Sequence, residues 1–353
     1  MPEELTLQRA GELFAELLPA RGPVASVSRF AEGSVTGAYR VEFANADAAP
    51  VVLKVYETDN LWCAAKESRA LKFLTDQGID ISPRVLAFAK SAQALDARPC
   101  VVSSMRPGRT LTTLDDQLTR TQRFEIYRQL GEVLSRLHAI PAAGYGYVIG
   151  EIRDPAPDNS MHMARIFERE LRLLRENRAD PAFTEKLAAH VAAYVAARAS
   201  AFAECSRPAY CHGDVHEPNL LAEVAEDGTC VLTGLLDPLN LHAGDPLMDF
   251  ARLDAFSMQG DPTKIAGLLR GYGVRAHEEQ AGAQPGAWPA SWRSRLRLYR
   301  IALALELYNW FSSTGEVHAL PGLARDLRTL MDEPRQAPHP TATEPGRDRP
   351  LPP

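Results

Sequence analysis

The spacing of hydrophobic positions changes along the chain, and the change divides it into a strand-rich first part and a helical second part. Residues 5–19 carry apolar side chains at helical spacing, whereas residues 25–57 alternate or are β-branched between glycine-containing turns, as strands do. A helix is expected next at 60–77, and further strands at 84–90 and 99–104. The first hundred residues therefore predict a small, mostly antiparallel sheet with one prominent helix.

Beyond Pro107-Gly108 the pattern is mostly helical. An apolar stripe predicts a helix that ends near His138, and a strand–loop–strand section is expected at 209–237. The other expected helices span 160–178, 184–203, 247–258, 262–272 and 292–314. The tail from Glu333 onward is rich in proline and is expected to be disordered. We thus predict three parts, namely a sheet-based lobe (1–105), a helical lobe (106–332) and a tail (333–353).

Composition narrows the class of protein. The 353 residues are 45% hydrophobic and 24% charged, as in an ordinary globular protein. A formal net charge of −6 argues against a nucleic-acid partner, because affinity for phosphate backbones comes from clustered lysine and arginine. Five scattered cysteines without a C-x-x-C pair fit a reducing compartment. No apolar run approaches the roughly 18 residues that span a bilayer, so we expect a cytoplasmic monomer or homodimer without a membrane partner.

The most informative segment is Tyr210-Cys-His-Gly-Asp-Val-His-Glu-Pro-Asn-Leu-Leu221, with Gly234-Leu-Leu-Asp-Pro238 after it. Phosphoryl transfer needs a carboxylate that orients the attacking hydroxyl and accepts its proton, and ligands for the Mg²⁺ that bridges the phosphates. Asp214 can be that carboxylate. Asn219 and Asp237 can supply metal ligands, because a hairpin would bring them together. His-Gly-Asp alone is as readily an ordinary turn, and Asp237 a strand-end cap, but the whole combination is far more specific.

The pattern H-G-D-x-x-x-x-N, an apolar strand and then D-x(7)-G-D-P-x-x-D resembles the aminoglycoside phosphotransferase family, which has the fold of the protein kinases. The resemblance extends over about residues 25–315. It implies an α+β, bilobal, protein-kinase-like fold with a small antiparallel sheet in the N-terminal lobe and a mostly helical C-terminal lobe. It also implies that Asp214 is the catalytic base and that Asn219 and Asp237 bind Mg²⁺.

The first part of the chain contains the residues that such a fold uses for a nucleotide. Lys54 stands alone in an apolar strand, where an unpaired charge is costly, and Glu67 follows on the next helix. By the resemblance, Lys54 binds the α- and β-phosphates and Glu67 holds it; the alternative is an edge-strand lysine and a solvated glutamate. Gly33, Ser34 and Gly37 form a strand–turn–strand segment that is either a phosphate-covering loop or an ordinary hairpin. No G-x-x-x-x-G-K-[ST] motif occurs, which excludes a P-loop kinase.

The resemblance also implies a hinge between the lobes at Ser103 and Met105, whose backbone groups would hold the purine of ATP or GTP. Asp245 and Asp249 would buttress the catalytic loop, and Asp249 is placed to cap the helix that follows. Residues 144–205 depart from the family pattern and lie where family members insert substrate-specific helices. The sequence does not decide between the two purines.

The acceptor is expected over Asp214, between residues 144–205 and the C-terminal helices. Candidate contacts are His216, Asp254 and Glu306. For His216 a structural role within the loop is an equal alternative, and for Glu306 the alternative is a solvent-facing position beside an apolar stripe.

The composition, rich in alanine, arginine and proline, is typical of a high-GC bacterial gene, and in that setting the family often inactivates antibiotics. Our first hypothesis is therefore an O-phosphotransferase that uses Mg²⁺ and ATP or GTP to phosphorylate a hydroxyl of an antibiotic and so confers resistance. The alternative is a metabolic kinase for a sugar, an amino alcohol or a homoserine-like compound. A pseudokinase that only binds is a remote alternative, because the lysine, glutamate, aspartates and asparagine of the motif are all present.

Overall fold

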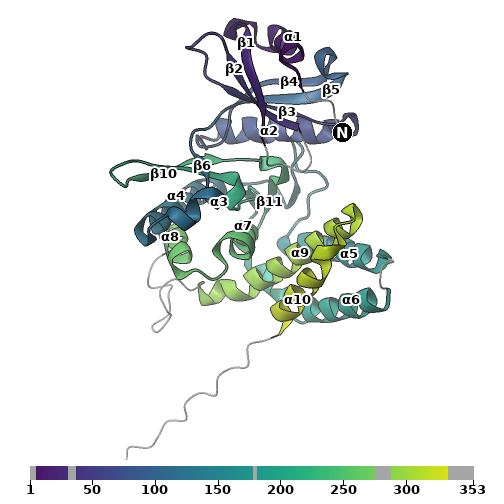
Figure 1. Ribbon diagram of the computed structural model, residues 1–353. Coiled ribbons are helices and arrows are strands. Elements are labelled where there is room, and N and C mark those ends of the chain that lie inside the picture. Colours follow the sequence, from purple (N-terminus) through teal and green to yellow (C-terminus); the bar gives the residue numbers. More distant parts are fainter. Residues whose placement is uncertain (1–4, 31–36, 178–180, 275–287, 333–353) are drawn as a thin grey trace, which may run out of the picture.

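The alternating apolar positions of the first hundred residues form a five-stranded antiparallel sheet (Figure 1). The structure is a computed structural model that describes residues 5–30, 37–177, 181–274 and 288–332. Burial alternates along β2 and β3, as it does when one face of a sheet is covered by a core. The order β1-β2-β3-β5-β4 places β3 at the centre. The strands are β1 (Val24–Arg29), β2 (Gly37–Phe43), β3 (Val51–Val55), β4 (Val85–Ala92) and β5 (Arg98–Ser104).

Two helices, α1 (Leu7–Leu17) and α2 (Leu61–Asp76), cover opposite faces of this sheet. Leu53 of β3 shares an apolar cluster with Phe14 of α1. The next residue, Lys54, reaches α2 instead. Successive side chains of a strand point to opposite faces, so the alternation in β3 separates the core under α1 from the polar contacts toward α2.

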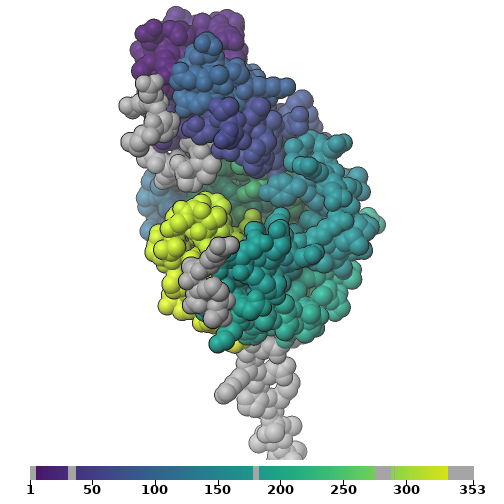
Figure 2. All heavy atoms as spheres, turned by 90° about the vertical axis from the view of Figure 1, so that its right-hand side faces the viewer, coloured from purple at the N-terminus to yellow at the C-terminus, as the bar shows by residue number. Residues whose placement is uncertain are grey.

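Helices make up most of the chain beyond β5, and one large apolar cluster joins them. They are α3 (Leu111–Leu114), α4 (Arg120–His138), α5 (Asn159–Glu176), α6 (Pro181–Ala196), α7 (Leu247–Leu253), α8 (Pro262–Tyr272), α9 (Ala290–Thr314) and α10 (Leu320–Met331). Figure 2 shows the sheet-based lobe, purple to blue, resting on this helical lobe, where the teal helices lie beside the yellow C-terminal ones. The predicted α+β, bilobal architecture is confirmed.

Two small three-stranded sheets in the helical lobe carry the loops of the motif. One consists of β6 (Arg109–Thr110), β9 (Leu220–Val224) and β10 (Cys230–Leu235), and the other of β7 (Gly146–Tyr147), β8 (Ala209–Cys211) and β11 (His242–Gly244). Residues 212–219 connect β8 with β9, and residues 236–241 connect β10 with β11. The N–H of Leu236 donates to Asn219 O at 2.8 Å, which holds the two loops together.

Some predictions differ from the structure or lie beyond it. The helix expected over 247–258 ends at Leu253 and continues as one π-helical turn, and helix α10 was not predicted. Gly33, Ser34 and the tail 333–353 lie outside the described residues. In the part of the chain that is described, no helix combines the length and the apolar character needed to cross a membrane.

Candidate active site

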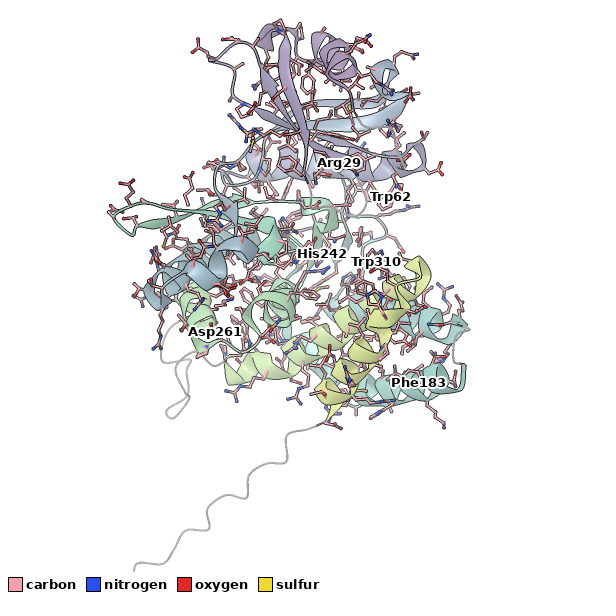
Figure 3. All side chains as sticks on the ribbon, viewed as in Figure 1. Arg29, Trp62, Phe183, His242, Asp261 and Trp310 are labelled. Atoms are coloured by element: carbon pink, nitrogen blue, oxygen red, sulfur yellow. The ribbon has the colours of Figure 1, made fainter. Side chains whose placement is uncertain are left out.

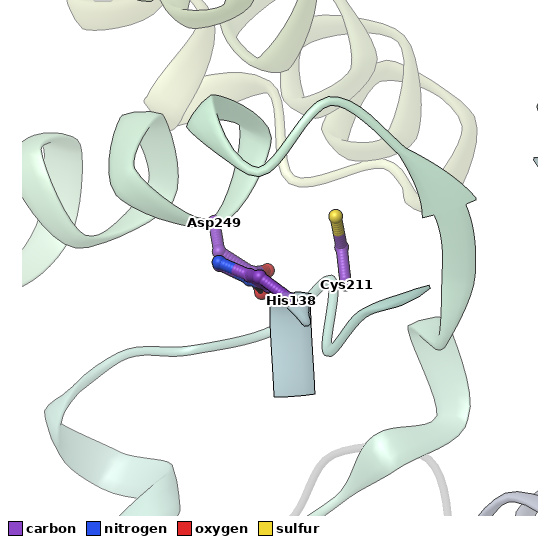
Figure 4. A group of neighbouring side chains, drawn as sticks. All are labelled: His138, Cys211 and Asp249. Atoms are coloured by element: carbon purple, nitrogen blue, oxygen red, sulfur yellow. Dashed lines mark hydrogen bonds and ion pairs between the residues drawn. The ribbon is translucent and has the colours of Figure 1, made fainter. Parts of the chain in front are cut away.

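The loop between β8 and β9 is fixed at its start by a buried carboxylate. Asp249, on α7, accepts the backbone N–H of His212 at 2.9 Å and that of Gly213 at 2.8 Å. His138 Nε2 lies 3.0 Å from Asp249 Oδ2 (Figure 4). Burial alone would raise the pKa of Asp249, but the hydrogen bond from His138 and the charges of nearby histidines lower it to about 2. Asp249 is therefore ionised at neutral pH and can hold both amides firmly.

The predicted buttressing role of Asp249 agrees with this geometry, but its predicted role as a helix cap is wrong. The N-cap position of α7 is occupied by Pro246, and Asp249 lies inside the helix. Asp245 supplies the bond that a cap would make, because its Oδ1 accepts the N–H of Leu247 at 3.0 Å. The carboxylate of Asp249 is unavailable for capping since it faces the catalytic loop.

His138, Cys211 and Asp249 lie close enough to be compared with a metal site, because one ligand atom of each lies within 4.8 Å of the others (Figure 4). Their hydrogen bonds explain the arrangement without a metal. The oxygens of Asp249 already accept from the loop and from His138. Burial, together with Asp249 and Asp245, raises the pKa of the Cys211 thiol well above its usual value, so a thiolate ligand is disfavoured. We interpret the cluster as part of the support for the loop.

The expected base and the first expected metal ligand are in direct contact. Asn219 Nδ2 donates to Asp214 O at 2.9 Å and to Asp214 Oδ2 at 3.1 Å. These bonds turn the amide nitrogen toward Asp214 and leave Asn219 Oδ1 free to accept or to bind a cation. The farther end of the loop is tied to the helical lobe, because Tyr127 OH donates to Glu217 Oε1 at 2.8 Å and Lys264 Nζ donates to the same atom at 2.7 Å.

The second expected metal ligand contacts the lysine of the sheet-based lobe. Lys54 Nζ lies 3.4 Å from Asp237 Oδ1 and 2.7 Å from Glu67 Oε1. Glu67 is buried and also accepts a hydrogen bond from Tyr56 OH. Burial alone would lower the pKa of Lys54, but the two carboxylates raise it overall, so the ammonium keeps its charge. Burial raises the pKa of Glu67, and the charge of Lys54 opposes that rise.

The backbone of Asp237 is in the left-handed region, with φ +57°. A non-glycine residue adopts this conformation at a cost of order 1–3 kcal/mol, and such residues cluster at functional sites. The carboxylate of Asp237 and Oδ1 of Asn219 are oxygen donors of the kind that Mg²⁺ prefers. This donor set fits the predicted metal.

Comparisons with known proteins identify the family of the chain. The family model APH, described as the phosphotransferase enzyme family, matches residues 26–284. The chain belongs to this phosphotransferase family. Its members transfer phosphoryl groups, so the family identifies the protein as an enzyme and leaves the pseudokinase alternative without support.

Solved structures with the same fold include aminoglycoside phosphotransferases and a fructosamine-3-kinase candidate. The phosphotransferase is 15% identical to APH(4)-Ia in its complex with ADP and hygromycin B (TM-score 0.65; 89% of this chain and 96% of that chain covered). It is 15% identical to APH(2")-IIia in its complex with GDP and kanamycin (TM-score 0.64; 92% and 98%). It is 20% identical to a fructosamine-3-kinase candidate from Thermobifida fusca YX-ER1 (TM-score 0.62; 90% and 98%). At these identities the likeness shows the fold alone.

The other described residues predicted to bind the nucleotide are Ser103, Met105 and Gly37, and they differ in how accessible they are to a ligand. Ser103 is buried in β5, and Met105 follows the end of that strand. The N–H of the intervening Ser104 donates to Arg84 O at 2.8 Å, so this amide is not available to a purine. Gly37 begins β2 and pairs with Val55, and the next pair along the two strands is Ala38 with Lys54. These residues stay predictions as nucleotide contacts.

A pocket of about 410 Å³ lies beside the catalytic loop of the phosphotransferase, where the acceptor was expected. Its lining includes Gly213 of the loop, Tyr147 from the segment 144–205, and Glu306 of α9. His242, labelled in Figure 3, also lines it and lies near the middle of the molecule beneath the sheet-based lobe.

Two candidate acceptor residues lie elsewhere. Asp254 is buried and already accepts from Trp288 Nε1 at 3.1 Å and from Arg300 Nη1 at 2.7 Å. His216 is not part of the lining, and its Nε2 lies 3.5 Å from Asp214 Oδ1. Of the three candidates, only Glu306 lines the pocket.

Sequence reasoning missed the arginine next to the expected base. Arg252 Nη1 lies 3.4 Å from Asp214 Oδ1, and the side chain also lines the pocket. The signal was present, because Arg252 comes three residues after Asp249 on a helix, and residues at this spacing share a face. Since Asp249 faces the loop, Arg252 had to lie near it as well.

Proposed function

We propose that this phosphotransferase moves the γ-phosphoryl group of ATP or GTP, with Mg²⁺, onto a hydroxyl of a small molecule. Asp214 orients the acceptor hydroxyl and accepts its proton. Asn219 and Asp237 hold the Mg²⁺, which neutralises charge on the phosphates when bound. Lys54, held by Glu67, contacts the α- and β-phosphates. The protein carries out this reaction in the cytoplasm.

The observation that carries this proposal is a line of contacts that crosses from one lobe to the other. It runs from Glu67 through Lys54 to Asp237, and from Asn219 to Asp214, with the Leu236–Asn219 backbone bond joining the two halves. The residues proposed as catalytic base, metal ligands and phosphate-binding cation are thus neighbours, which supports the proposal. Phosphoryl transfer depends on positioning and charge neutralisation, which is what this arrangement offers.

For the acceptor, an antibiotic is the first candidate, supported by the same fold in proteins whose structures contain hygromycin B or kanamycin with a nucleotide. A metabolic acceptor is the second candidate, supported by the fold of a fructosamine-3-kinase candidate. The pocket beside Gly213 is large enough for a ligand of either class.

A mass-spectrometric screen tests the proposal. The purified protein, Mg²⁺ and either ATP or GTP are incubated with a panel of antibiotics and common hydroxylated metabolites. We expect one product heavier by a phosphoryl group, and its formation should fall by about a hundredfold or more in Asp214→Ala, since general bases contribute at least this much. Nucleotide affinity in that variant should stay close to that of the wild type.

Asp227→Ala provides a matched control, because this aspartate lies in the exposed turn between β9 and β10. It should turn over like the wild type. Turnover by Asp214→Ala at the wild-type rate would refute the assigned base. A product that forms equally well after magnesium is removed with a chelator would refute the metal assignment.

A further inference from the structure

Arginines predominate among the charged residues that line the pocket beside the catalytic loop. Among the described residues that line it, the charged ones are Arg153, Arg165, Arg169, Arg252, Asp154 and Glu306. Two of these guanidinium groups, those of Arg169 and Arg252, lie beside carboxylates that are not part of the lining, Glu170 and Asp214. The question is therefore which arginines a ligand can reach.

The histidines of the lining carry no charge. Burial lowers the pKa of His162 to about 4 and also lowers the pKa of His242, so both rings are neutral at pH 7. Burial raises the pKa of Glu306. Lys66 adds a buried ammonium behind the wall of the pocket, with its Nζ 3.6 Å from the ring centre of Tyr147.

Two of the arginines are available to a ligand. Arg153 is exposed and forms no ion pair with any residue that the structure describes. Arg165 donates from Nη1 to Asp154 O at 3.0 Å, and this nitrogen lies 3.6 Å from Asp154 Oδ2. The Asp154 side chain is 87% exposed, so this ion pair is solvated and contributes little.

The other two arginines are already engaged within the protein. Arg169 Nε donates to Glu170 Oε1 at 2.8 Å, and Arg252 Nη1 approaches Asp214 Oδ1 at 3.4 Å. Arg252 therefore marks the end of the pocket at which the acceptor hydroxyl meets the base. Arg153 and Arg165 belong to the wall formed by the segment 144–205, which the catalytic motif does not require.

We propose that the acceptor carries an oxyanion, either a carboxylate or a phosphate ester, which Arg153 and Arg165 bind while its hydroxyl faces Asp214; this rests on the proposed function. Guanidinium groups suit this task because their planar N–H donors match the two oxygens of such an anion. A polyammonium acceptor such as an aminoglycoside would place like charges beside Arg153 and Arg165. The acceptor class is thus a hydroxy acid or a phosphorylated hydroxy compound, whether antibiotic or metabolite.

Matched probes test this preference without turnover. The full-length enzyme, loaded with Mg²⁺ and a non-hydrolysable ATP analogue, is titrated in a calorimeter with glucose, gluconate, glucose 6-phosphate and glucosamine. We expect at least one of the two anions to bind about tenfold more tightly than glucose or glucosamine, the effect of a charge-assisted pair. Gluconate as the tighter ligand identifies a carboxylate acceptor, and glucose 6-phosphate identifies a phosphate acceptor.

The variants decide whether the arginines are responsible. The double substitution Arg153→Gln and Arg165→Gln should abolish the advantage of the anions. Arg172→Gln should retain it, because Arg172 lies farther along α5, is exposed and does not line the pocket. Glucosamine binding as tightly as the anions, an advantage that survives the double substitution, or no anion binding at millimolar concentration would each overturn the proposal.

The two proposals fail in different ways. Asp214-dependent transfer onto aminoglycosides alone would uphold the phosphotransferase function and overturn the anionic acceptor. Anion binding that depends on Arg153 and Arg165, in an enzyme that transfers no phosphoryl group to any acceptor, would uphold the preference of the pocket and refute the proposed function.

Discussion

Gly213, which precedes the expected base, offers the sharpest test of how the loop positions Asp214. Its backbone is left-handed, with φ +78°, and a Cβ added there would lie 2.2 Å from Asn240 O and 2.9 Å from His242 Nδ1. Asn240 belongs to the loop that follows Asp237, so the clash would occur between the two loops of the site. We expect Gly213→Ala to separate these loops.

The size of the effect follows from two contributions. A left-handed alanine costs about 1–2 kcal/mol, which lowers stability but need not affect catalysis. The clash is with backbone, which cannot rotate away, so one loop must move by about 1 Å, and a displacement of this size costs about a hundredfold in rate. We therefore expect kcat to fall about a hundredfold while the protein stays folded.

Gly78→Ala separates the two contributions. Gly78 has nearly the same φ, +73°, but no atom lies within 4 Å of its added Cβ. This variant should lose similar stability and keep its kcat. The assay is phosphoryl transfer to the acceptor that the screen identifies, with urea unfolding as the measure of stability. Wild-type kcat in Gly213→Ala, or an equal loss of kcat in both variants, would refute the argument that the clash displaces the base.

Three further predictions concern charges that the site or its supports hold. Asp237→Ala should remove the magnesium dependence of nucleotide binding, which calorimetry with and without Mg²⁺ measures. The same magnesium dependence in the variant and in the wild type would contradict the metal role. Lys66→Met should raise the free energy of unfolding by about 1–2 kcal/mol at pH 7, since burial lowers the pKa of Lys66 to about 8 and the contact with Tyr147 offsets part of that penalty. This gain in stability should fade between pH 8 and 10.5, because in that range the unfolded chain still binds the proton that folded Lys66 releases. If urea unfolding at pH 10.5 still shows the full gain, the explanation by burial of the Lys66 charge is wrong. Lys264→Met should cost about 3 kcal/mol in the same assay, because it leaves Glu217 without its buried partner, whereas a neutral result would show that water replaces the ammonium.

The proximity of the proposed catalytic residues could be predicted from the sequence because their geometry is local. Asp214 and Asn219 share one short loop, and the hairpin β9–β10 returns the chain to Asp237 beside them. Lys54 and Glu67 could be predicted for a similar reason, because a strand followed at once by a helix leaves few ways to pack. In each case the spacing along the chain determines the distance in space.

The candidate acceptor residues could not be chosen in this way, because their positions depend on how helices rotate in the packed lobe. Asp254 and Glu306 look alike as single acids among apolar residues, yet Asp254 is taken by Trp288 and Arg300 while Glu306 reaches the pocket. Nothing near Asp254 in the sequence indicates these partners, which lie more than thirty residues away.

Helix α5 shows the same limit for the charge of the pocket. Arg165, Arg169 and Arg172 follow one another at spacings of four and three residues, so they lie on one face of the helix. Only the first two line the pocket, because the wall ends before Arg172, which pairs instead with Glu176 at 3.6 Å. Which of these arginines reaches the pocket is decided by the elements that pack opposite α5, here α9 and the loop after β7. The proximity of the motif residues can thus be predicted from the sequence alone, whereas the packing of the helical lobe decides which side chains of the segment 144–205 reach the pocket.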